Sequence, residues 1–157
     1  MINKILLDKK AYGILKSPVY YYRKRLDNSS SIDTNLSKKE YYIDRLKYHF
    51  LNLIEYCFSK EGKIPLFIQY TLAYNIQWMV TPTMPKFDSK EEKNEFIRLF
   101  NEVLSYISVE ALASKKLIRS DSLRYYLISK RNNELHIDFN SNDNEVYIRS
   151  KHRQLDK

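Results

Sequence analysis

The sequence predicts a mainly α fold, a helical hairpin or bundle with a short helix-strand leader before it and a β-hairpin after it. Apolar residues recur at steps of three and four between residues 37 and 107, the spacing of one helix face. Serines suited to helix starts and glycine or proline suited to helix ends bound these runs. After residue 133 the apolar period becomes two, as in strands.

The leader is predicted as a helix, a break and a strand. Residues 2–9 favour a short helix, which ends before Tyr12-Gly13. Pro18 disfavours a helix, and the β-branched and aromatic run Val19 to Tyr22 favours an edge strand that leads into Arg23-Lys24-Arg25. A polar loop over residues 27–31 follows.

Two longer helices come next. Ser37 and Glu40 have capping-box spacing, so a helix is expected to begin there. Its apolar stripe ends near Gly62, a residue type that commonly terminates helices. Pro65 suits the first turn of a second helix, which prolines 82 and 85 end. These two helices are expected to form a hairpin.

Three more helices and a hairpin complete the prediction. Ser89 and Glu92 repeat the capping-box spacing ahead of the clearest apolar stripe in the chain, which continues to Ile107. Residues 108–116 and 121–130 favour two shorter helices. Leu135, Ile137, Phe139, Val146 and Ile148 then alternate with polar residues around an Asn-rich turn, as in a β-hairpin. Because two strands alone are marginally stable, this hairpin is expected to dock on the helices or to open a further β-domain.

Composition excludes several kinds of active site. Gly13 and Gly62 are the only glycines, so no Gly-rich phosphate loop is present. Cys57 is the only cysteine, which excludes a disulfide within the chain and a Cys-based zinc site. His49 is expected to be a partly buried core or interface residue, and neither of the other two histidines stands in a catalytic pattern. We therefore predict no catalytic residue, no metal ligand and no cofactor.

Basic residues are unevenly distributed. Residues 1–25 hold seven basic and one acidic residue, whereas residues 26–114 hold ten and twelve. A second cluster between Lys115 and Arg131 has six basic residues against one acidic. Such clusters suit phosphate groups, nucleic acid or an anionic membrane surface, and solvated surface that aids solubility is the equally weighted alternative. The longest apolar stretches are shorter than the ~20 residues of a spanning helix.

The most specific candidate site follows the predicted strand. Arg23, Lys24 and Arg25 would present three cationic groups, and Ser29, Ser30 and Ser31 add hydroxyls on a loop. Together these groups can hold phosphate oxygens, with arginine binding two of them at once. The alternative is a positively charged strand end followed by a linker, and composition alone slightly favours that alternative.

Two segments resemble a known enzyme family. Residues 2–7, Tyr12-Gly13 and the run from Val19 to Arg25 with Ser29-Ser30 resemble the C-terminal end of the catalytic domain of family 2 glycosyltransferases of the GT-A fold. Within this family, the chain resembles the members that build capsular polysaccharide or decorate teichoic acid. Residues 64–70 and 74–78 are similar to the helical region that follows this domain. The resemblance covers about residues 2–110 and implies a segment that lacks the Asp-x-Asp motif and the acidic base.

This resemblance implies a domain organisation and a role. Residues 1–34 would be the tail end of the catalytic domain, 35–131 a helical accessory domain, and 132–157 a β-hairpin tail or the start of a further β-domain. Arg23, Lys24, Arg25, Ser29 and Ser30 would line the acceptor or diphosphate side of the active site. Many relatives carry a metal-binding His where this chain has Arg25, so no metal role is implied.

The expected function is that of an accessory or linker region of a bacterial glycosyltransferase for cell-surface polysaccharide, inactive alone. Nucleotide-sugar and glycan acceptor would be reached only through the missing catalytic domain. The expected location is cytoplasmic, peripheral at the inner face of the membrane, with an anionic membrane surface or a second copy as further partners. The alternative is a small basic nucleic-acid-binding or structural interaction module; the nearly neutral helical body and the lack of a recognition motif count against nucleic acid.

Overall fold

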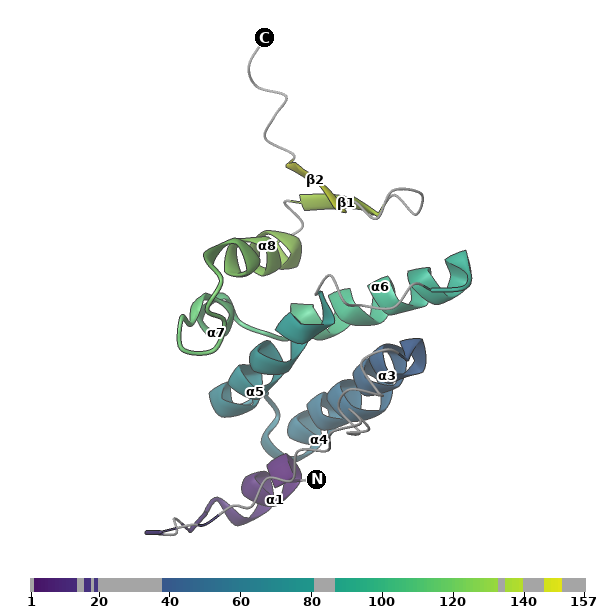
Figure 1. The fold of residues 1–157 in the computed structure, drawn as a ribbon. Helices are drawn as coiled ribbons and strands as arrows, with labels where there is room; N and C mark the ends of the chain where they lie inside the picture. The colour runs from purple at the N-terminus through teal and green to yellow at the C-terminus, as the bar shows by residue number, and fades with distance from the viewer. Residues whose placement is uncertain are drawn as a thin grey trace.

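The fold was analysed in a computed structural model, which describes residues 2–13, 16–17, 19, 38–80, 87–132, 135–139 and 146–150. For Lys39, Glu40 and the last two of these ranges it describes the backbone alone. The described part is mainly helical, which confirms the predicted class (Figure 1). Of the predicted edge strand Val19–Tyr22 only Val19 is described, and it is exposed and in no strand. The rest of this strand and the loop after it lie outside the described residues.

The first long helix consists of three segments. α3 (Lys39–Asp44) runs into a π-helical segment, η1 (Arg45–Leu51), and then into α4 (Asn52–Glu61). The N-cap of α3 is Lys38, one residue after the predicted cap Ser37, which is not described. Gly62 has φ 66°, a left-handed conformation that glycine adopts without strain, and the helix ends there as predicted.

The predicted hairpin is present. α5 (Leu66–Ile76) and the short 3₁₀ segment η2 (Gln77–Met79) return along the first helix, and Arg45 at the start of η1 hydrogen-bonds to Asn75 near the end of α5. Pro65 precedes the first turn, where its carbonyl accepts from the N–H groups of Ile68 and Gln69. The antiparallel arrangement therefore follows from one short connection.

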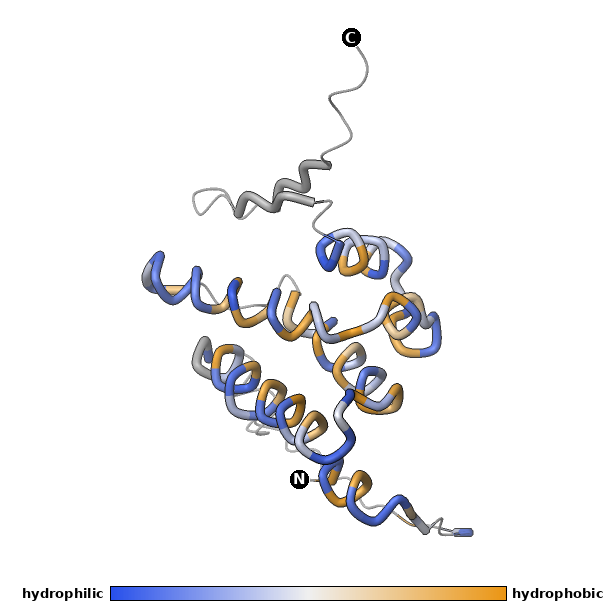
Figure 2. The backbone as a smooth tube through the Cα atoms, turned by 180° about the vertical axis from the view of Figure 1, so that it is seen from behind, coloured by the Kyte–Doolittle hydropathy of each residue, from blue (hydrophilic) through white to orange (hydrophobic). Residues whose placement is uncertain are grey.

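α6 (Lys90–Ser105) lies between the first helix and α8 (Asp121–Arg131), as Figure 1 shows. Ser89 Oγ accepts from the N–H of Glu92 at 3.1 Å, so the predicted capping serine is confirmed. In Figure 2 the hydrophobic parts of α6 and of the α3–α4 helix face one another. α7 (Val109–Ala113) packs on both α5 and α8.

One hydrophobic core joins these helices. Tyr42 of α3 and Phe96 of α6 meet edge to face with 6.4 Å between ring centroids, and Phe96 also contacts Phe100. The fully buried large side chains are Tyr42, Leu46, Ile68, Leu72, Ile76, Met79, Leu99, Leu104, Ile107, Leu112, Ile118 and Leu127. α3, η1, α5, η2, α6, α7 and α8 contribute to this set, and α4 adds the buried Leu53, Ile54 and Cys57 to the core.

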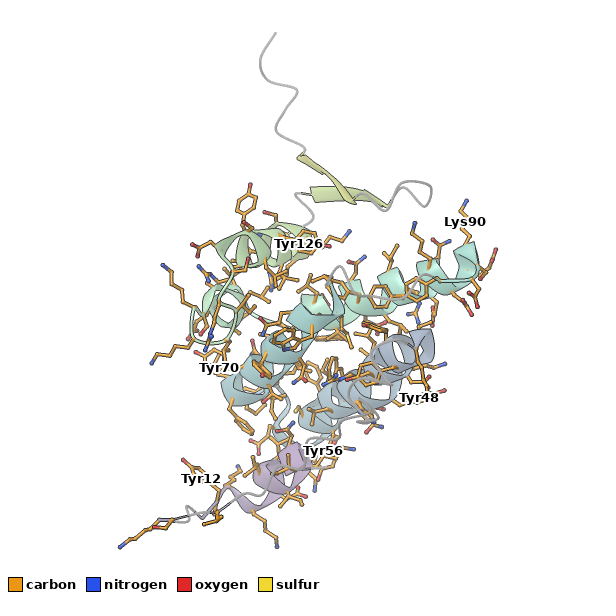
Figure 3. All side chains as sticks on the ribbon, viewed as in Figure 1. Tyr12, Tyr48, Tyr56, Tyr70, Lys90 and Tyr126 are labelled. Carbon is orange, nitrogen blue, oxygen red and sulfur yellow. The ribbon has the colours of Figure 1, made fainter. Side chains whose placement is uncertain are left out.

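α1 (Ile2–Lys9) is attached to the outside of α4 and contributes Leu7 to the core. The hydroxyl of Tyr56, which lies on the side of α4 facing α1, donates to the carboxylate of Asp8 (Figure 3). Lys60 and Lys10 add ion pairs, to Asp8 at 3.7 Å and to Glu61 at 3.0 Å. The leader helix is therefore held mainly by polar contacts.

Beyond α8 the backbone forms two strands, β1 (Leu135–Phe139) and β2 (Val146–Ser150). They pair antiparallel, with Ile137 opposite Ile148. Since none of their side chains is described, the predicted C-terminal hairpin and its docking on the helices stay predictions.

Candidate functional site

The phosphate-binding residues predicted from the sequence, Arg23, Lys24, Arg25, Ser29 and Ser30, lie outside the described residues. Their role stays a prediction. Among the described residues, two arginines have very different partners: Arg124 lies on α8 and Arg45 lies at the start of η1.

The arginines of α8 stabilise the fold. Arg124 is only 7% exposed, and its Nη1 donates to the carbonyl oxygens of Ile118 at 2.6 Å and Arg119 at 3.2 Å. Its Nη2 pairs with Asp121. Arg131 Nε donates to the carbonyl of Ile107 at 2.6 Å. Part of the basic cluster between Lys115 and Arg131 is therefore used to satisfy backbone carbonyls within the fold.

The rest of this cluster faces solvent or lies partly buried. Lys115, Lys116 and Arg119 are exposed. Burial lowers the pKa of Lys130, because a charged ammonium is less well solvated there. Solvated surface therefore explains the exposed members, and structural hydrogen bonding explains Arg124 and Arg131.

α5 has an exposed aromatic side. Its inner side is fully buried through Ile68, Leu72 and Ile76. Its outer side carries Phe67 and Tyr74, which are 41% and 49% exposed, and η2 continues this side with Trp78, which is 51% exposed. These three side chains are the outer rings of α5. The tube in Figure 2 is accordingly orange or pale over most of α5. A helix that is apolar on all sides is usually buried all round, so the exposure of its outer rings needs an explanation.

Two of these rings form a pair. Tyr74 and Trp78 are four residues apart, so they are neighbours on one helix face. Their rings meet edge to face, with 6.4 Å between centroids. This arrangement limits the motion of both side chains, each of which is about half exposed.

Arg45 lies beside this face. Its guanidinium donates to the hydroxyl of Tyr41 and to the side-chain oxygen of Asn75. Its central carbon is 5.2 Å from the ring centroid of Tyr41 and 5.5 Å from that of Phe50. Asn75 is held in turn, because its amide donates to the carbonyl of Thr71 at 2.7 Å. Asn75 follows Tyr74 directly and precedes Trp78 by three residues, so Arg45 contacts α5 within one turn of these rings.

The partners of Arg45 are neutral. Arg98 pairs with Glu95 and Glu102, and Arg124 pairs with Asp121, but no carboxylate among the described residues is paired with Arg45. The side chain is half-buried, and a cation in such a place is normally compensated by an anion. The arrangement can therefore supply a fixed positive charge to an anionic ligand.

The backbone at Arg45 is also unusual. η1 begins at this residue and is π-helical over its seven residues, whereas α3 and α4 on either side are α-helical. π-helical turns are rare and occur frequently at functional sites. The widened turn therefore marks the same place as the uncompensated charge.

Other reactive groups in the described part have structural explanations. Cys57 is buried, and burial raises the pKa of its thiol, which keeps it protonated and unreactive. His49 is exposed, so it is not a core residue: η1 turns it outward while Leu46 and Phe50 enter the core, and the alternative of an interface residue stays a prediction. Over the described ranges, no group of three His, Cys, Asp or Glu side chains is placed to hold a metal ion.

Sequence reasoning missed Arg45 as a site residue. Arg45 directly follows Asp44 in the nearly neutral part of the chain and belongs to neither basic cluster, so the uneven distribution of charge did not single it out. Residues 74–78 were assigned to the second predicted helix and to the family resemblance, without a role in binding. The remaining signal was available: a helix with aromatic residues at positions 67, 70, 74 and 78 has more apolar surface than one core-facing side requires.

None of the helices that the structure describes combines the length and apolar character needed to cross a bilayer. No family model matches the chain, and the search of solved structures found no match.

Two curated proteins of Bacillus subtilis (strain 168) match over most of this chain. The minor teichoic acid biosynthesis protein GgaB is 33% identical over 120 residues, which are 75% of this chain and 13% of that protein. The minor teichoic acid biosynthesis protein GgaA is 24% identical over 119 residues, which are 73% of this chain and 27% of that protein. The chain is thus homologous to a part, about a quarter or less, of each of these two teichoic acid biosynthesis proteins.

Proposed function

We propose that this chain is the C-terminal helical accessory region of a bacterial glycosyltransferase for cell-surface polysaccharide, and that it transfers no sugar by itself. The observation that carries the proposal is the homology over about three quarters of the chain to two teichoic acid biosynthesis proteins. Their greater length is consistent with catalytic machinery that lies elsewhere, in a GT-A domain. The sugar polymer concerned would be teichoic acid or capsular polysaccharide.

The attachment of α1 supports a connection between the two parts. In this proposal, residues 1–34 are the tail end of the catalytic domain. Leu7 enters the core, and Asp8 accepts from the Tyr56 hydroxyl at 2.7 and 2.8 Å and pairs with Lys60. Such contacts would fix the catalytic domain against the helical body of residues 35–131. Ile2 and Ile5, 69% and 51% exposed, offer an apolar side of α1 to that domain.

The predicted phosphate-binding residues fit this arrangement. Arg23, Lys24, Arg25, Ser29 and Ser30 follow α1 directly in the chain, so they would stand at the acceptor or diphosphate side of the catalytic domain. Residues 132–157 would form a β-hairpin tail or begin a further β-domain. The exposed lysines 115 and 116 would favour a peripheral position at the anionic inner leaflet.

The proposed function is tested in the bacterium that encodes the chain. Deletion of this coding segment is expected to lower the ratio of sugar to phosphate in the purified wall polymer, and expression of the full chain in trans with the remaining enzyme is expected to restore it. An unchanged ratio after deletion contradicts the proposal. Purified chain incubated with labelled nucleotide-sugars and wall polymer is expected to transfer nothing, and transfer would contradict the accessory role.

No observation favours nucleic acid over this function. Arg124 and Arg131 are engaged within the fold, which reduces the charge available to a phosphate backbone. Binding to DNA that weakens steeply with salt would support that alternative.

A further inference from the structure

We propose that Arg45 and the outer rings of α5 form a subsite for a phosphorylated sugar unit of an anionic glycan. The inference rests on the proposed function and deepens it, because it names the chemistry of the acceptor that the accessory region would hold. It would make this region an acceptor-binding element as well as a connector.

Arg45 brings a positive charge and unused hydrogen-bond donors to this subsite. A guanidinium carries more N–H donors than the Tyr41 hydroxyl and the Asn75 oxygen take up. Both acceptors are neutral, so the positive charge of Arg45 is not compensated within the described residues. Arginine donors in a planar fork match the oxygens of a phosphate. A phosphodiester in a glycan would supply both the negative charge and the missing acceptors.

Arg45 is held in place before a ligand arrives. The guanidinium lies 5.2 Å from the Tyr41 ring and 5.5 Å from the Phe50 ring, and Phe50 is itself buried. Cation–π contacts of this kind fix an arginine that would otherwise sample many rotamers. Binding therefore orders little side-chain motion, which favours affinity.

The exposed rings contribute the apolar part of this subsite. Tyr74 and Trp78 are each about half exposed, and they pair edge to face. The C–H groups on one side of a pyranose ring form an apolar surface that can pack on an aromatic face. Rings with an apolar body and a polar edge are typical of such partly wet binding surfaces. A sugar on these rings would have its phosphate within reach of the Arg45 side of the helix.

These features together select one class of ligand. A neutral sugar would leave the charge of Arg45 unused, and free phosphate would leave the rings unused. A phosphorylated glycan uses both. Single-stranded nucleic acid also combines phosphate with ring stacking, so it is the competing ligand in the experiment.

The binding experiment uses the full chain and its own fluorescence. Trp78 is the only tryptophan, so tryptophan-selective excitation reports directly on the proposed subsite. The probes are phosphorylated dextran, unmodified dextran, polyphosphate and single-stranded DNA. Saturable change of Trp78 fluorescence with phosphorylated dextran is expected, with much weaker responses to the other three.

Matched variants locate the charge. Arg45→Gln is expected to raise the Kd for phosphorylated dextran by about tenfold or more, because a charge-assisted hydrogen bond is lost. Arg119→Gln removes the same charge from an exposed position and is expected to change the Kd less than about twofold. Tyr74→Ser is expected to raise it roughly threefold to tenfold through the lost ring contact. Protection of the Cys57 thiol verifies that each variant is folded.

Each other outcome overturns the inference. Equal effects of Arg45→Gln and Arg119→Gln would remove Arg45 from the site. An equal response to unmodified dextran would show that the phosphate is not recognised. Tighter binding of polyphosphate or DNA would show that the sugar is not recognised. If Arg45→Gln does not fold, Arg45→Lys replaces it, because lysine keeps the charge and lacks the planar set of guanidinium donors. The Kd values of Arg45→Lys and Tyr74→Ser then show whether the two side chains bind the ligand.

The two proposals fail separately. Arg45-dependent binding together with an unchanged wall polymer after deletion would refute the proposed function and leave the subsite. A changed wall polymer without Arg45-dependent binding would refute the subsite and leave the proposed function.

Discussion

Arg45 and Arg124 are both withdrawn from solvent on helices of one small body, yet their surroundings differ in kind. Arg124 is paired with Asp121 and donates to two backbone carbonyls. Arg45 donates to the Tyr41 hydroxyl and the Asn75 amide oxygen and lies beside the rings of Tyr41 and Phe50. A basic cluster in the sequence therefore does not by itself locate a binding site. The chemistry of the partners does, because a charge already neutralised has little left for a ligand.

The largest expected effect on stability is at Arg124. Arg124→Ala is expected to lower the free energy of unfolding by about 2–4 kcal/mol, because it leaves two carbonyl acceptors at the edge of the core without their donor. Urea denaturation measures the change. Arg119→Ala is the control, with an expected change within about 0.5 kcal/mol. Equal values for the two variants would show that Arg124 does not stabilise the fold.

The next effect is at the start of the same helix. Ser120 Oγ accepts from the N–H of Leu123 at 3.2 Å and so caps α8. Ser120→Ala is expected to cost about 1 kcal/mol, the usual value for loss of an N-cap. The exposed neighbour Ser122 is the matched control in the same denaturation assay, since Ser122→Ala removes a hydroxyl that caps nothing. A larger loss at Ser122 would contradict the assignment.

A smaller effect is expected at Arg45. Arg45→Met keeps the stem of the side chain and removes a charge that has no anionic partner among the described residues, so the free energy of unfolding is expected to change by less than about 1 kcal/mol. The same urea experiment measures it. A loss as large as that of Arg124→Ala would make Arg45 a structural arginine and would remove the contrast between the two regions.

The last prediction concerns Tyr126 on α8 and has no consequence at neutral pH. Burial raises the pKa of Tyr126 to about 12, because the phenolate is poorly solvated there. The folded state therefore prefers the protonated phenol. Its contribution to stability is complete below the unfolded pKa of about 10 and is lost as the pH rises through 12. Ultraviolet titration of the wild type against Tyr126→Phe detects this late-ionising tyrosine, and its absence would contradict the burial.

The sequence predicted the helices well because their signals are local. Ser89, Pro65 and Gly62 mark helix ends through their own backbone and side-chain preferences, and the stripe of α6 needs only its own spacing. The π-helical turn at Arg45 was not predictable in this way. η1 packs against α6, and a contact between distant segments of the chain is not visible in the local sequence.

The site was predictable only in part for the same reason. Local charge density drew attention to Arg23–Arg25 and to the cluster around Arg124. Arg45 acquires its importance from Asn75, thirty positions further along the chain, and the exposure of Trp78 depends on which side of α5 the core takes. The residue spacing within one helix does not predict which side chains of two hairpin helices will contact each other.

The most direct test of the account is complementation of the deletion strain. Wild-type chain, Arg45→Gln and Arg119→Gln are expressed at equal levels, and the ratio of sugar to phosphate in the purified wall polymer is measured. Wild type and Arg119→Gln are expected to restore the ratio, and Arg45→Gln is expected to restore it only in part. Full restoration by Arg45→Gln, or a wall polymer that never depended on the chain, would contradict the account.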